Sequence, residues 1–354
     1  MEGLRQGVYP GAVLLVGKGD EIVFFQAVGH RALIPRERPM EDETIFDLAS
    51  LTKPLATALA ILKMVDQGII ALDEPLHDLL PLPVPEGKQG ITPRLLLSHS
   101  GGFKDWEPFY LDLVHVEAEK RKVQLRHRLL HMPLAYKPGQ KTVYSDLGFM
   151  LLEWVIEERS GSSLPQFMAR HIFGALSLRR TLFVDEGGSM SLGSDQFAAT
   201  EDCPWRKRVV AGFVHDENAY ALGGYSGHAG LFGSAREVYS VAHLLLSHFR
   251  GERDDFFRPE TVREFLRRHE PAAGGTWALG WDTPSSKGSS SGVYFSPDSV
   301  GHLGFTGTSV WVDLAKGVIV VLLTNRIHPS RKNQKIREFR PKMHNLVMEA
   351  LGEG

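Results

Sequence analysis

IFDLASLTKPLATALAIL, residues 45–62, is the stretch that decides how the rest of the chain is interpreted. It places Ser50 and Lys53 three residues apart at the start of a predicted helix. Apolar residues recur at helical spacing over residues 54–67, and Gly68 follows as a C-terminal stop. We therefore predict a mostly buried helix that carries the serine and the lysine in its first turn.

Ser50 and Lys53 meet the geometric condition for a nucleophile and its base, because residues i and i+3 share a helix face. A serine hydroxyl is a weak nucleophile until a base takes its proton, and a lysine is that base only when its pKa is drawn below about 10.4. Unpaired N–H groups in the first turn can also stabilise an oxyanion. A chain of this length contains S-x-x-K about once by chance, so the motif alone leaves a polar helix cap as the alternative.

The composition favours a globular protein without a nucleic-acid partner. The chain has 354 residues, 43% of them hydrophobic, and its net charge is −2. That is enough for a substantial core in one large domain or two interleaved ones. A balanced charge gives no long-range field that gathers polyanions. We interpret the basic run RIHPSRKNQKIREFRPK, residues 326–342, as the solvated face of a terminal helix.

The start of the chain bears on its location. Residues 1–20 hold only about six consecutive apolar residues before a lysine, too few for a signal peptide or a membrane span. We expect a cytoplasmic protein by default, and a periplasmic or extracellular one if a leader was removed. The single cysteine, Cys203, rules out an intramolecular disulfide, and its neighbours include no histidine to activate it. The sequence does not indicate the oligomeric state.

Strands are predicted at both ends of the chain, with helices between them. Residues 12–18 and 21–28 read as a hairpin, and residues 308–325 as two strands joined by a tight turn and followed by an amphipathic helix. The pattern between residues 73 and 177 is helical. Residues 186–233 are irregular and glycine-rich, which predicts functional loops. We expect one sheet assembled from the two ends of the chain.

Two other motifs are interpreted as structural. GSSSG at residues 288–292 matches G-x-S-x-G, but a nucleophile elbow needs a strand before it and a helix after it, and this copy lies in a low-complexity stretch. HRLLH at residues 127–131 lacks the glutamate of a metalloprotease site. We therefore expect a flexible surface loop, an exposed basic helix and no metal.

Two later segments add weight to Ser50. Tyr144 opens a predicted amphipathic helix in YSDLGFMLLEWVIEERSG, and His302 leads a glycine-rich strand in GHLGFTGTSVWVDL. A tyrosine can relay the serine proton to a leaving group, and a glycine-rich strand edge lets a substrate backbone approach closely. Each feature alone is commonly structural. Their occurrence together and in this order favours a catalytic site.

With these residues, the chain resembles the serine β-lactamase and penicillin-binding protein superfamily, specifically its class C-like branch with D-amino peptidases and family VIII esterases. That family carries S-x-x-K, then Y-x-N, then K-T-G or H-T-G, in this order. Here the three motifs stand as SLTK at Ser50, YSD at Tyr144 and HLG at His302. The likeness runs from about Gly11 to the C-terminal helix.

The resemblance implies an α+β fold with the site in a cleft. An antiparallel sheet flanked by helices, an α/β sandwich, would pack against an all-helical domain in the β-lactamase/transpeptidase-like arrangement. We assign residues 1–72 and 226–354 to the sheet domain. Residues 73–225 would form the mainly helical domain, with active-site loops.

The resemblance also assigns roles. Ser50 would form an acyl-enzyme, with Lys53 and Tyr144 sharing the proton transfers. The oxyanion hole would be the backbone N–H groups of Ser50 and Phe305, which need no special side chain. No metal or organic cofactor is implied.

Departures from the family pattern bear on the substrate, for which Asp146, His302 and Gly304 are the predicted binding residues. Asp146 replaces asparagine and, when ionised, can only accept a hydrogen bond. That favours a substrate with a donor or cation, or makes Asp146 a partner of Lys53. His302 in place of lysine would make carboxylate binding depend on pH, and Leu303 in place of threonine removes a hydroxyl. These changes argue against an efficient β-lactamase.

Three polar residues of the loop after Val214 have two open interpretations. His215, Asp216 and His228 either line the cleft or hold the loop by hydrogen bonds.

The sequence thus predicts a serine hydrolase that cleaves carboxylic esters or D-amino-acid amide or peptide bonds, with at most weak β-lactam hydrolysis. Its partners would be small-molecule esters, D-amino-acid peptides or β-lactam-like compounds. One alternative is a class C-like β-lactamase. Another is a protein that binds peptidoglycan fragments or a partner without turnover, which the weakened HLG motif favours.

Overall fold

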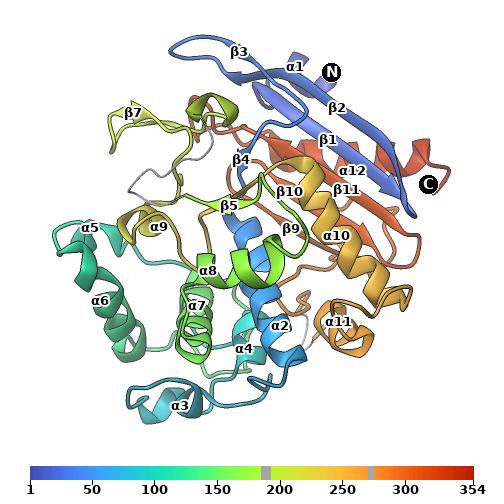
Figure 1. The fold of residues 1–354 in the computed structure, drawn as a ribbon. Coiled ribbons are helices and arrows are strands. Elements are labelled where there is room, and N and C mark those ends of the chain that lie inside the picture. The colour runs from blue at the N-terminus through green and yellow to red at the C-terminus, as the bar shows by residue number, and fades with distance from the viewer. Residues whose placement is uncertain (185–192, 270–274) are drawn as a thin grey trace.

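A six-stranded sheet joins the two ends of the chain (Figure 1). The computed structural model describes residues 1–184, 193–269 and 275–354. The strands run in the order β3-β2-β1-β11-β10-β9, and every neighbouring pair is antiparallel. The six are β1 Gly11–Lys18, β2 Glu21–Ala32, β3 Arg38–Pro39, β9 Val300–Leu303, β10 Ser309–Asp313 and β11 Val318–Thr324. The prediction of one sheet built from both ends is confirmed.

Strand β11 shows why both faces of this sheet are covered. All of its residues are buried, and successive side chains point to opposite faces. Ile319, Val321 and Leu323 pack in the main core with α10 (Ala235–Arg250). Val320 and Leu322 pack in a second cluster with α12 (Ile336–Ala350). The continuous Val-Ile-Leu run is the pattern expected of a strand with an apolar layer on each side.

The remaining helices lie mostly on the side of α10, away from α12 (Figure 1). Helix α7 is buried along most of its length, from Leu147 to Ile156, which marks it as central to this helical region. The helices are α1 Glu2–Arg5, α2 Leu59–Asp66, α3 Leu76–Leu79, α4 Pro93–Leu97, α5 Tyr110–Leu113, α6 Ala118–His131, α7 Asp146–Ser160, α8 Leu164–Met168, α9 Glu217–Ala221 and α11 Pro259–Leu266. The division into residues 1–72 with 226–354, and 73–225, stays a prediction.

Short elements connect these layers. Tight helical turns are η1 Ala49–Leu51, η3 Glu86–Lys88 and η5 Ser194–Gln196, and wide π-type turns are η2 Lys53–Ala58 and η4 Ala169–Phe173. Small sheets are formed by β4 Phe46–Asp47, β5 Leu182–Phe183 and β8 Leu231–Gly233, and by β6 Asp202–Cys203 with β7 Arg208–Val209. The predicted loop region 186–233 contains several of them, and its residues 186–192 lie outside the described residues.

The opening stretch folds as a helix in three parts. Ser50 lies in η1, Lys53 begins η2, and α2 continues to Asp66 before Gly68 turns the chain with a φ of +70°. The predicted helix over residues 54–67 is confirmed. Its first turns are tighter and then wider than an α-helix, which is common where a helix carries functional groups.

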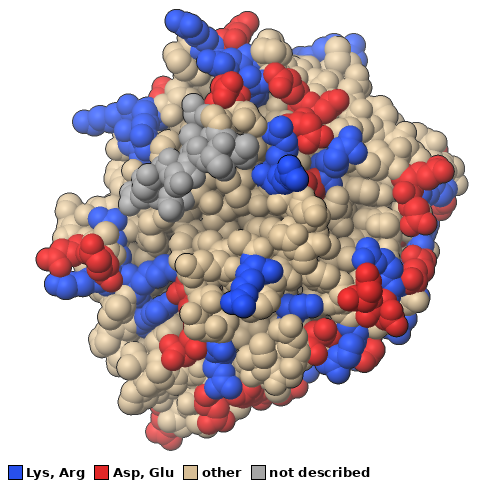
Figure 2. Space-filling view, in the orientation of Figure 1, with Lys and Arg blue, Asp and Glu red and all other residues tan. Residues whose placement is uncertain are grey.

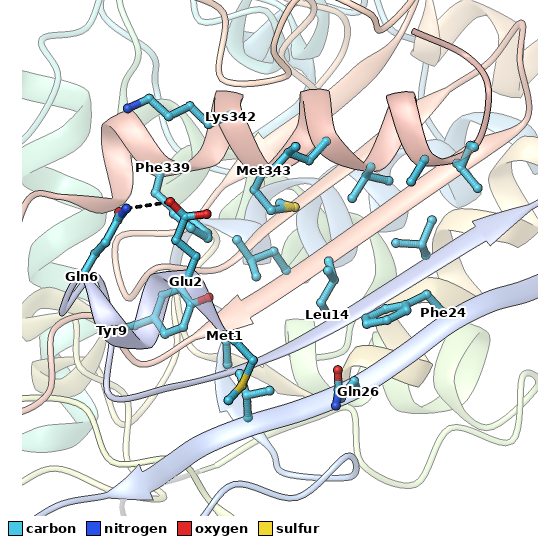
Figure 3. Close-up of a pocket in the computed structure, with 18 of the residues that line it drawn as sticks. Met1, Glu2, Gln6, Tyr9, Leu14, Phe24, Gln26, Phe339, Lys342 and Met343 are labelled. Atoms are coloured by element: carbon cyan, nitrogen blue, oxygen red, sulfur yellow. Dashed lines mark hydrogen bonds between the residues drawn. The ribbon is translucent and has the colours of Figure 1, made fainter.

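An apolar groove lies on the outer face of the sheet, between α12 on one side and β1 and β2 on the other (Figure 3). Its volume is about 520 Å³, and Leu14, Phe24 and Met343 are among the residues that line it. None of the predicted site residues lines this groove. The candidate site is therefore elsewhere.

The surface charges agree with the balanced composition. On the face shown in Figure 2, acidic and basic side chains are interspersed. None of the helices in the described parts of the chain has the length and apolarity needed to cross a membrane.

Candidate active site

The turn that carries Ser50 is held by buried contacts. Ala49, directly before it, has a φ of +48°, a conformation that costs a non-glycine residue of order 1–3 kcal/mol. The Asp47 carboxylate accepts hydrogen bonds from the N–H groups of Ala49 at 2.8 Å and His215 at 2.6 Å. The hydroxyl of Thr52 donates to the carbonyl of Ala49 at 2.6 Å. The position of the serine is thus fixed by residues on both sides of it in the sequence.

Lys53 lies against the hydroxyl of Ser50. Its Nζ donates to Ser50 Oγ at 3.1 Å and to the backbone carbonyl of His228 at 3.3 Å. The lysine side chain is fully buried, and its ammonium lies 2.7 Å from Oδ1 of Asp146. Two segments far apart in the sequence thus meet at one nitrogen. Of the two interpretations of Asp146, the structure shows it as a partner of Lys53.

The charge of Lys53 differs from what the sequence suggests. Burial lowers the pKa of Lys53, but the carboxylate of Asp146 and the hydroxyl of Tyr144 outweigh burial, and the pKa is raised above its ordinary value. The expectation that a depressed pKa leaves Lys53 as a neutral amine, able to accept the serine proton, is therefore wrong for the resting site. The reason is the Asp146 carboxylate, because the family's asparagine carries no charge there.

Tyr144 lies beside Ser50 and Lys53. It lies just before Ser145, the N-cap of α7, rather than on the helix itself. Burial raises the pKa of Tyr144, while interactions with Lys53 and a hydrogen bond with Ser50 oppose the rise without cancelling it. The rings of His99 and Trp277 pack against it with centroids 4.7 and 5.6 Å away. The phenol is therefore neutral and fixed in place beside the serine.

The edge of β9 supplies the second wall of the site. The carbonyl of Leu48 lies so close that a Cβ at Gly304 would be 2.6 Å from its oxygen, so only glycine fits at this position. Within the described parts of the chain, the backbone N–H groups of Ser50 and Phe305 donate to no acceptor. Both residues line one pocket. Two free N–H groups beside a nucleophile are what an oxyanion hole requires.

His302 does not behave as predicted. Burial, and then the charge of Lys53, lower its pKa to about 3, so the imidazole is neutral near pH 7. Its Nδ1 lies 2.9 Å from the carbonyl of Leu303, which can only accept, so Nδ1 carries the hydrogen. The other ring nitrogen, Nε2, is a buried acceptor without a partner in the described residues. The prediction of pH-dependent carboxylate binding by His302 is therefore wrong, because the ring is deprotonated by burial.

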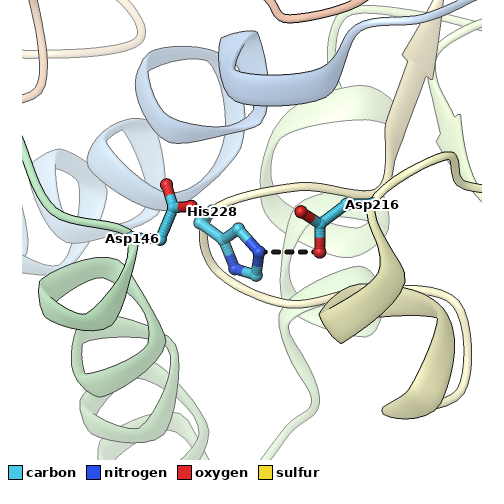
Figure 4. A group of neighbouring side chains, drawn as sticks. All are labelled: Asp146, Asp216 and His228. Atoms are coloured by element: carbon cyan, nitrogen blue, oxygen red, sulfur yellow. Dashed lines mark hydrogen bonds and ion pairs between the residues drawn. The ribbon is translucent and has the colours of Figure 1, made fainter. Parts of the chain in front are cut away.

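The three predicted loop residues, His215, Asp216 and His228, are not among those that line the pocket of Ser50. Figure 4 shows His228 between Asp146 and Asp216, with its Nε2 2.9 Å from the Asp216 carboxylate. Burial lowers the pKa of His228, but the carboxylate of Asp216 and then that of Asp146 outweigh burial, and the pKa is raised above its ordinary value. His215 contacts Glu201 at 3.1 Å. Of the two open interpretations, these contacts correspond to holding the loop.

The three side chains drawn in Figure 4 are the candidate cation ligands. Ligand atoms of Asp146, Asp216 and His228 lie within 4.8 Å of one another, and no other such group is present in the described residues. The two carboxylates already have partners, since Asp146 contacts Lys53 and Asp216 contacts His228. A metal ion would have to displace these contacts.

The pocket in front of Ser50 has a volume of about 530 Å³, within the range of small-molecule sites. The GSSSG stretch is a loop, as predicted, but Ser291 is fully buried, so it is not simply a surface loop. Sequence analysis missed part of the lining, namely Trp277, Asp282, Ser290, Arg326, Arg337 and Arg340. The three arginines belong to the basic run interpreted as a solvated helix face. That interpretation is wrong for two of them, because Arg326 and Arg340 are buried.

Comparison with known families identifies this arrangement. A family model described as Beta-lactamase matches residues 1–340. The chain belongs to the beta-lactamase family. The suspected resemblance is therefore confirmed.

Two relatives show the range of activities in this part of the beta-lactamase family. An N-acetylmuramyl-L-alanine amidase of Bacillus subtilis is 32% identical, over 90% of this chain and 78% of the relative. A putative D-alanyl-D-alanine carboxypeptidase of Escherichia coli K12 is 31% identical, over 90% of this chain and 79% of the relative. Family members similar to this chain are thus named as enzymes that cut amide bonds.

Solved structures confirm the β-lactamase/transpeptidase-like fold. EstCE1, described as a hydrolase with promiscuous acyltransferase activity, superposes with a TM-score of 0.73 at 22% identity, covering 96% of both chains. A penicillin-binding protein from Bacillus halodurans gives a TM-score of 0.70 at 21% identity, covering 98% of both. At this identity the likeness concerns the fold alone. This beta-lactamase-family protein thus has the α+β architecture expected from its motifs.

Proposed function

We propose that this protein is a serine hydrolase that forms an acyl-enzyme at Ser50 and cleaves carboxylic esters or D-amino-acid amide or peptide bonds. The observation that carries the proposal is the 3.1 Å contact between Lys53 Nζ and Ser50 Oγ, in front of a pocket with two free backbone N–H groups. Nucleophile, proton-transfer group and oxyanion donors are the parts that acyl transfer requires.

The proton inventory suggests how Ser50 is activated. Lys53 is an ammonium at rest, so it can accept the serine proton only by giving one up. Asp146, 2.7 Å away, is the acceptor that the site provides. As Ser50 Oγ bonds to the carbonyl carbon, its proton moves to Lys53 and a lysine proton moves to Asp146. The tetrahedral oxyanion is stabilised by the N–H groups of Ser50 and Phe305.

Collapse of that intermediate needs a proton on the leaving group. Tyr144 is neutral because its pKa is raised, so its hydroxyl can donate to the departing amine or alkoxide. It regains a proton from Lys53, and Asp146 then returns one to the lysine. Water attacks the acyl-enzyme by the same path in reverse, which frees the acid and Ser50. No proton leaves the group of four residues except with product.

The substrate class is supported by two kinds of observation. The relatives are named for cleaving amide bonds of muramyl and D-alanyl compounds. This chain also shares its fold with EstCE1, which is described as a hydrolase with promiscuous acyltransferase activity. The third motif lacks the charged residue of an efficient β-lactamase, since His302 is neutral. We therefore propose ester and D-amino-acid amide hydrolysis with at most weak β-lactam turnover.

Binding without turnover is the second candidate, and one observation favours it. The raised pKa of Lys53 leaves the resting site without a free amine to activate water for deacylation. In that case Ser50 would be acylated once, and the acyl group would stay on the serine.

Burst kinetics with 4-nitrophenyl acetate test the proposal. A serine hydrolase releases about one equivalent of nitrophenol rapidly and then turns over steadily, whereas a non-turnover binder stops after the burst. Ser50→Ala should abolish both phases. Ser290→Ala is the matched control, because Ser290 lines the same pocket and is the central serine of the rival GSSSG motif. Full activity in Ser50→Ala would exclude the proposal.

A further inference from the structure

The exposed face of α12 carries an apolar side chain between two charges of opposite sign. Lys342, Leu346 and Glu349 are four and three residues apart, so they share one face of the helix. All three are exposed, Leu346 at 58%. Neither Lys342 nor Glu349 makes an ion pair or a side-chain hydrogen bond with any described residue. The helix thus presents a positive end, an apolar centre and a negative end.

The groove next to this face is also apolar and partly exposed. Leu346 lines it from α12, and Val23 and Phe24, 46% and 44% exposed, line it from β2 (Figure 3). Among the described residues, β3 pairs with β2 only at His30 and Ala32, so the part of β2 beside the groove is an edge of the sheet. Natural proteins usually cover an apolar edge or place charges on it. Exposed apolar side chains gathered on a helix and a sheet edge therefore indicate a contact surface.

A two-fold axis makes this face complementary to itself. In such a contact, each residue meets its counterpart's partner, so every pairing occurs twice. The helical rise places Lys342 about 6 Å and Glu349 about 4.5 Å from Leu346 along the axis, in opposite directions. If two α12 helices lie antiparallel about a point near Leu346, Lys342 of each copy therefore meets Glu349 of the other, and the two leucines meet at the centre.

We infer that this face binds a second copy of the chain, with the two α12 helices antiparallel and each lying over the groove of the other copy. A parallel pair would instead set Lys342 against Lys342 and Glu349 against Glu349. A lipid surface or a small apolar ligand would cover the groove but would leave Glu349 without a cation. None of the three interface residues of α12 lines the pocket of Ser50, so the inference stands apart from the proposed function.

Light scattering on a size-exclusion column, over a wide range of protein concentration, tests the association. The wild type should reach a mass near twice that of the 39.4 kDa chain. Leu346→Asp should raise the dissociation constant at least about 10-fold, because it places charge at the centre of the contact. Leu111→Asp is the matched control, since Leu111 is 52% exposed but lies on α5 and lines no part of the groove. It should leave the dissociation constant unchanged.

Two further results of that experiment would overturn the inference. One is a wild type that is monomeric at every concentration, including one that sediments with phosphatidylglycerol vesicles, which would assign the face to a lipid surface. The other is a Leu346→Asp variant that associates as tightly as the wild type.

Charge reversal tests the antiparallel arrangement itself. Lys342→Glu sets two acidic side chains against each other in each contact, and Glu349→Lys sets two basic ones, so each variant alone should dimerise about 10-fold more weakly. A mixture of the two variants restores opposite charges in both contacts and should form a one-to-one heterodimer. A variant that had lost its fold could not give this result. If the mixture associates no better than either variant alone, the inference is overturned.

Discussion

Replacing Asp146 with asparagine tests the proton path most sharply. The substitution keeps the shape of the side chain and removes the carboxylate that lies 2.7 Å from Lys53 Nζ. In the wild type, the lysine and the carboxylate act as a pair, because Lys53 passes a proton to Asp146 as it accepts the proton of Ser50. In the variant, Lys53 must itself be neutral before it can accept that proton. Activity of Asp146→Asn should therefore fall as the pH is lowered through the lysine pKa, while the wild type remains active at the same pH.

The ion pair between Lys53 and Asp146 should also contribute strongly to the free energy of unfolding. Lys53 is fully buried and the Asp146 side chain is 15% exposed. Removing one member of a buried ion pair typically costs 3–5 kcal/mol, and the asparagine oxygen still accepts a hydrogen bond, so we expect a loss of about 3 kcal/mol at pH 7. The magnitude would be measured as the free energy of unfolding in urea.

The pH dependence of that loss has a definite sign. In the wild type, the pKa of Lys53 is raised above its ordinary 10.5, so the stabilisation is complete below pH 10.5 and is lost only as the pH rises through the folded-state pKa. In Asp146→Asn, burial is opposed only by Tyr144, so the pKa of Lys53 lies below its wild-type value and alkaline pH relieves the buried charge. The difference in stability between the two proteins should thus narrow from pH 7 to pH 10.

Asp112→Asn is the matched control, because Asp112 forms an ion pair of the same 2.7 Å length with Arg128 at the surface. It should cost less than about 1 kcal/mol and leave the pH profile of activity unchanged. The reasoning is refuted if Asp146→Asn extends activity to lower pH than the wild type. That result would mean that the wild-type reaction waits for a neutral Lys53 and that Asp146 accepts no proton.

Three further predictions follow from the site. Tyr144→Phe should lower kcat about 10²- to 10⁴-fold with little change in KM in steady-state assays, since it removes a proton donor and keeps the ring. Gly304→Ala should lose activity and melt at a lower temperature, because its Cβ would meet the carbonyl of Leu48 at 2.6 Å. Because the pKa of His302 is about 3, KM for a carboxylate substrate should not follow a histidine titration between pH 5 and 8; an inflection near 6.5 that disappears in His302→Gln would contradict this.

Local sequence spacing was sufficient to predict that Ser50 and Lys53 lie together. Ser50 and Lys53 lie within one helical turn, and their 3.1 Å contact follows from i, i+3 geometry. The two ends of the sheet were also predictable, because β1 and β11 are continuous apolar runs with clear turns. Tyr144 and Gly304 were predicted as site residues from the order of the motifs. That order places distant segments together by family likeness rather than by a physical argument.

Charge states and pocket walls were not predictable in the same way. The pKa of Lys53 depends on burial and on a carboxylate from α7, and neither can be derived from the residues around the lysine. The amphipathic terminal helix was predicted correctly, but periodicity does not say which neighbour each face meets. For that reason Arg340 was assigned to solvent, although it is buried against the carbonyls of the β9–β10 turn.

The most direct test of the account is mass spectrometry of the protein quenched during turnover of 4-nitrophenyl acetate. The account predicts an acetyl group on the peptide that contains Ser50, formed in the wild type and in Ser290→Ala and lost on continued incubation. It predicts no such adduct in Ser50→Ala. An acetylated residue other than Ser50 that accounts for turnover, or steady turnover by Ser50→Ala, would contradict it.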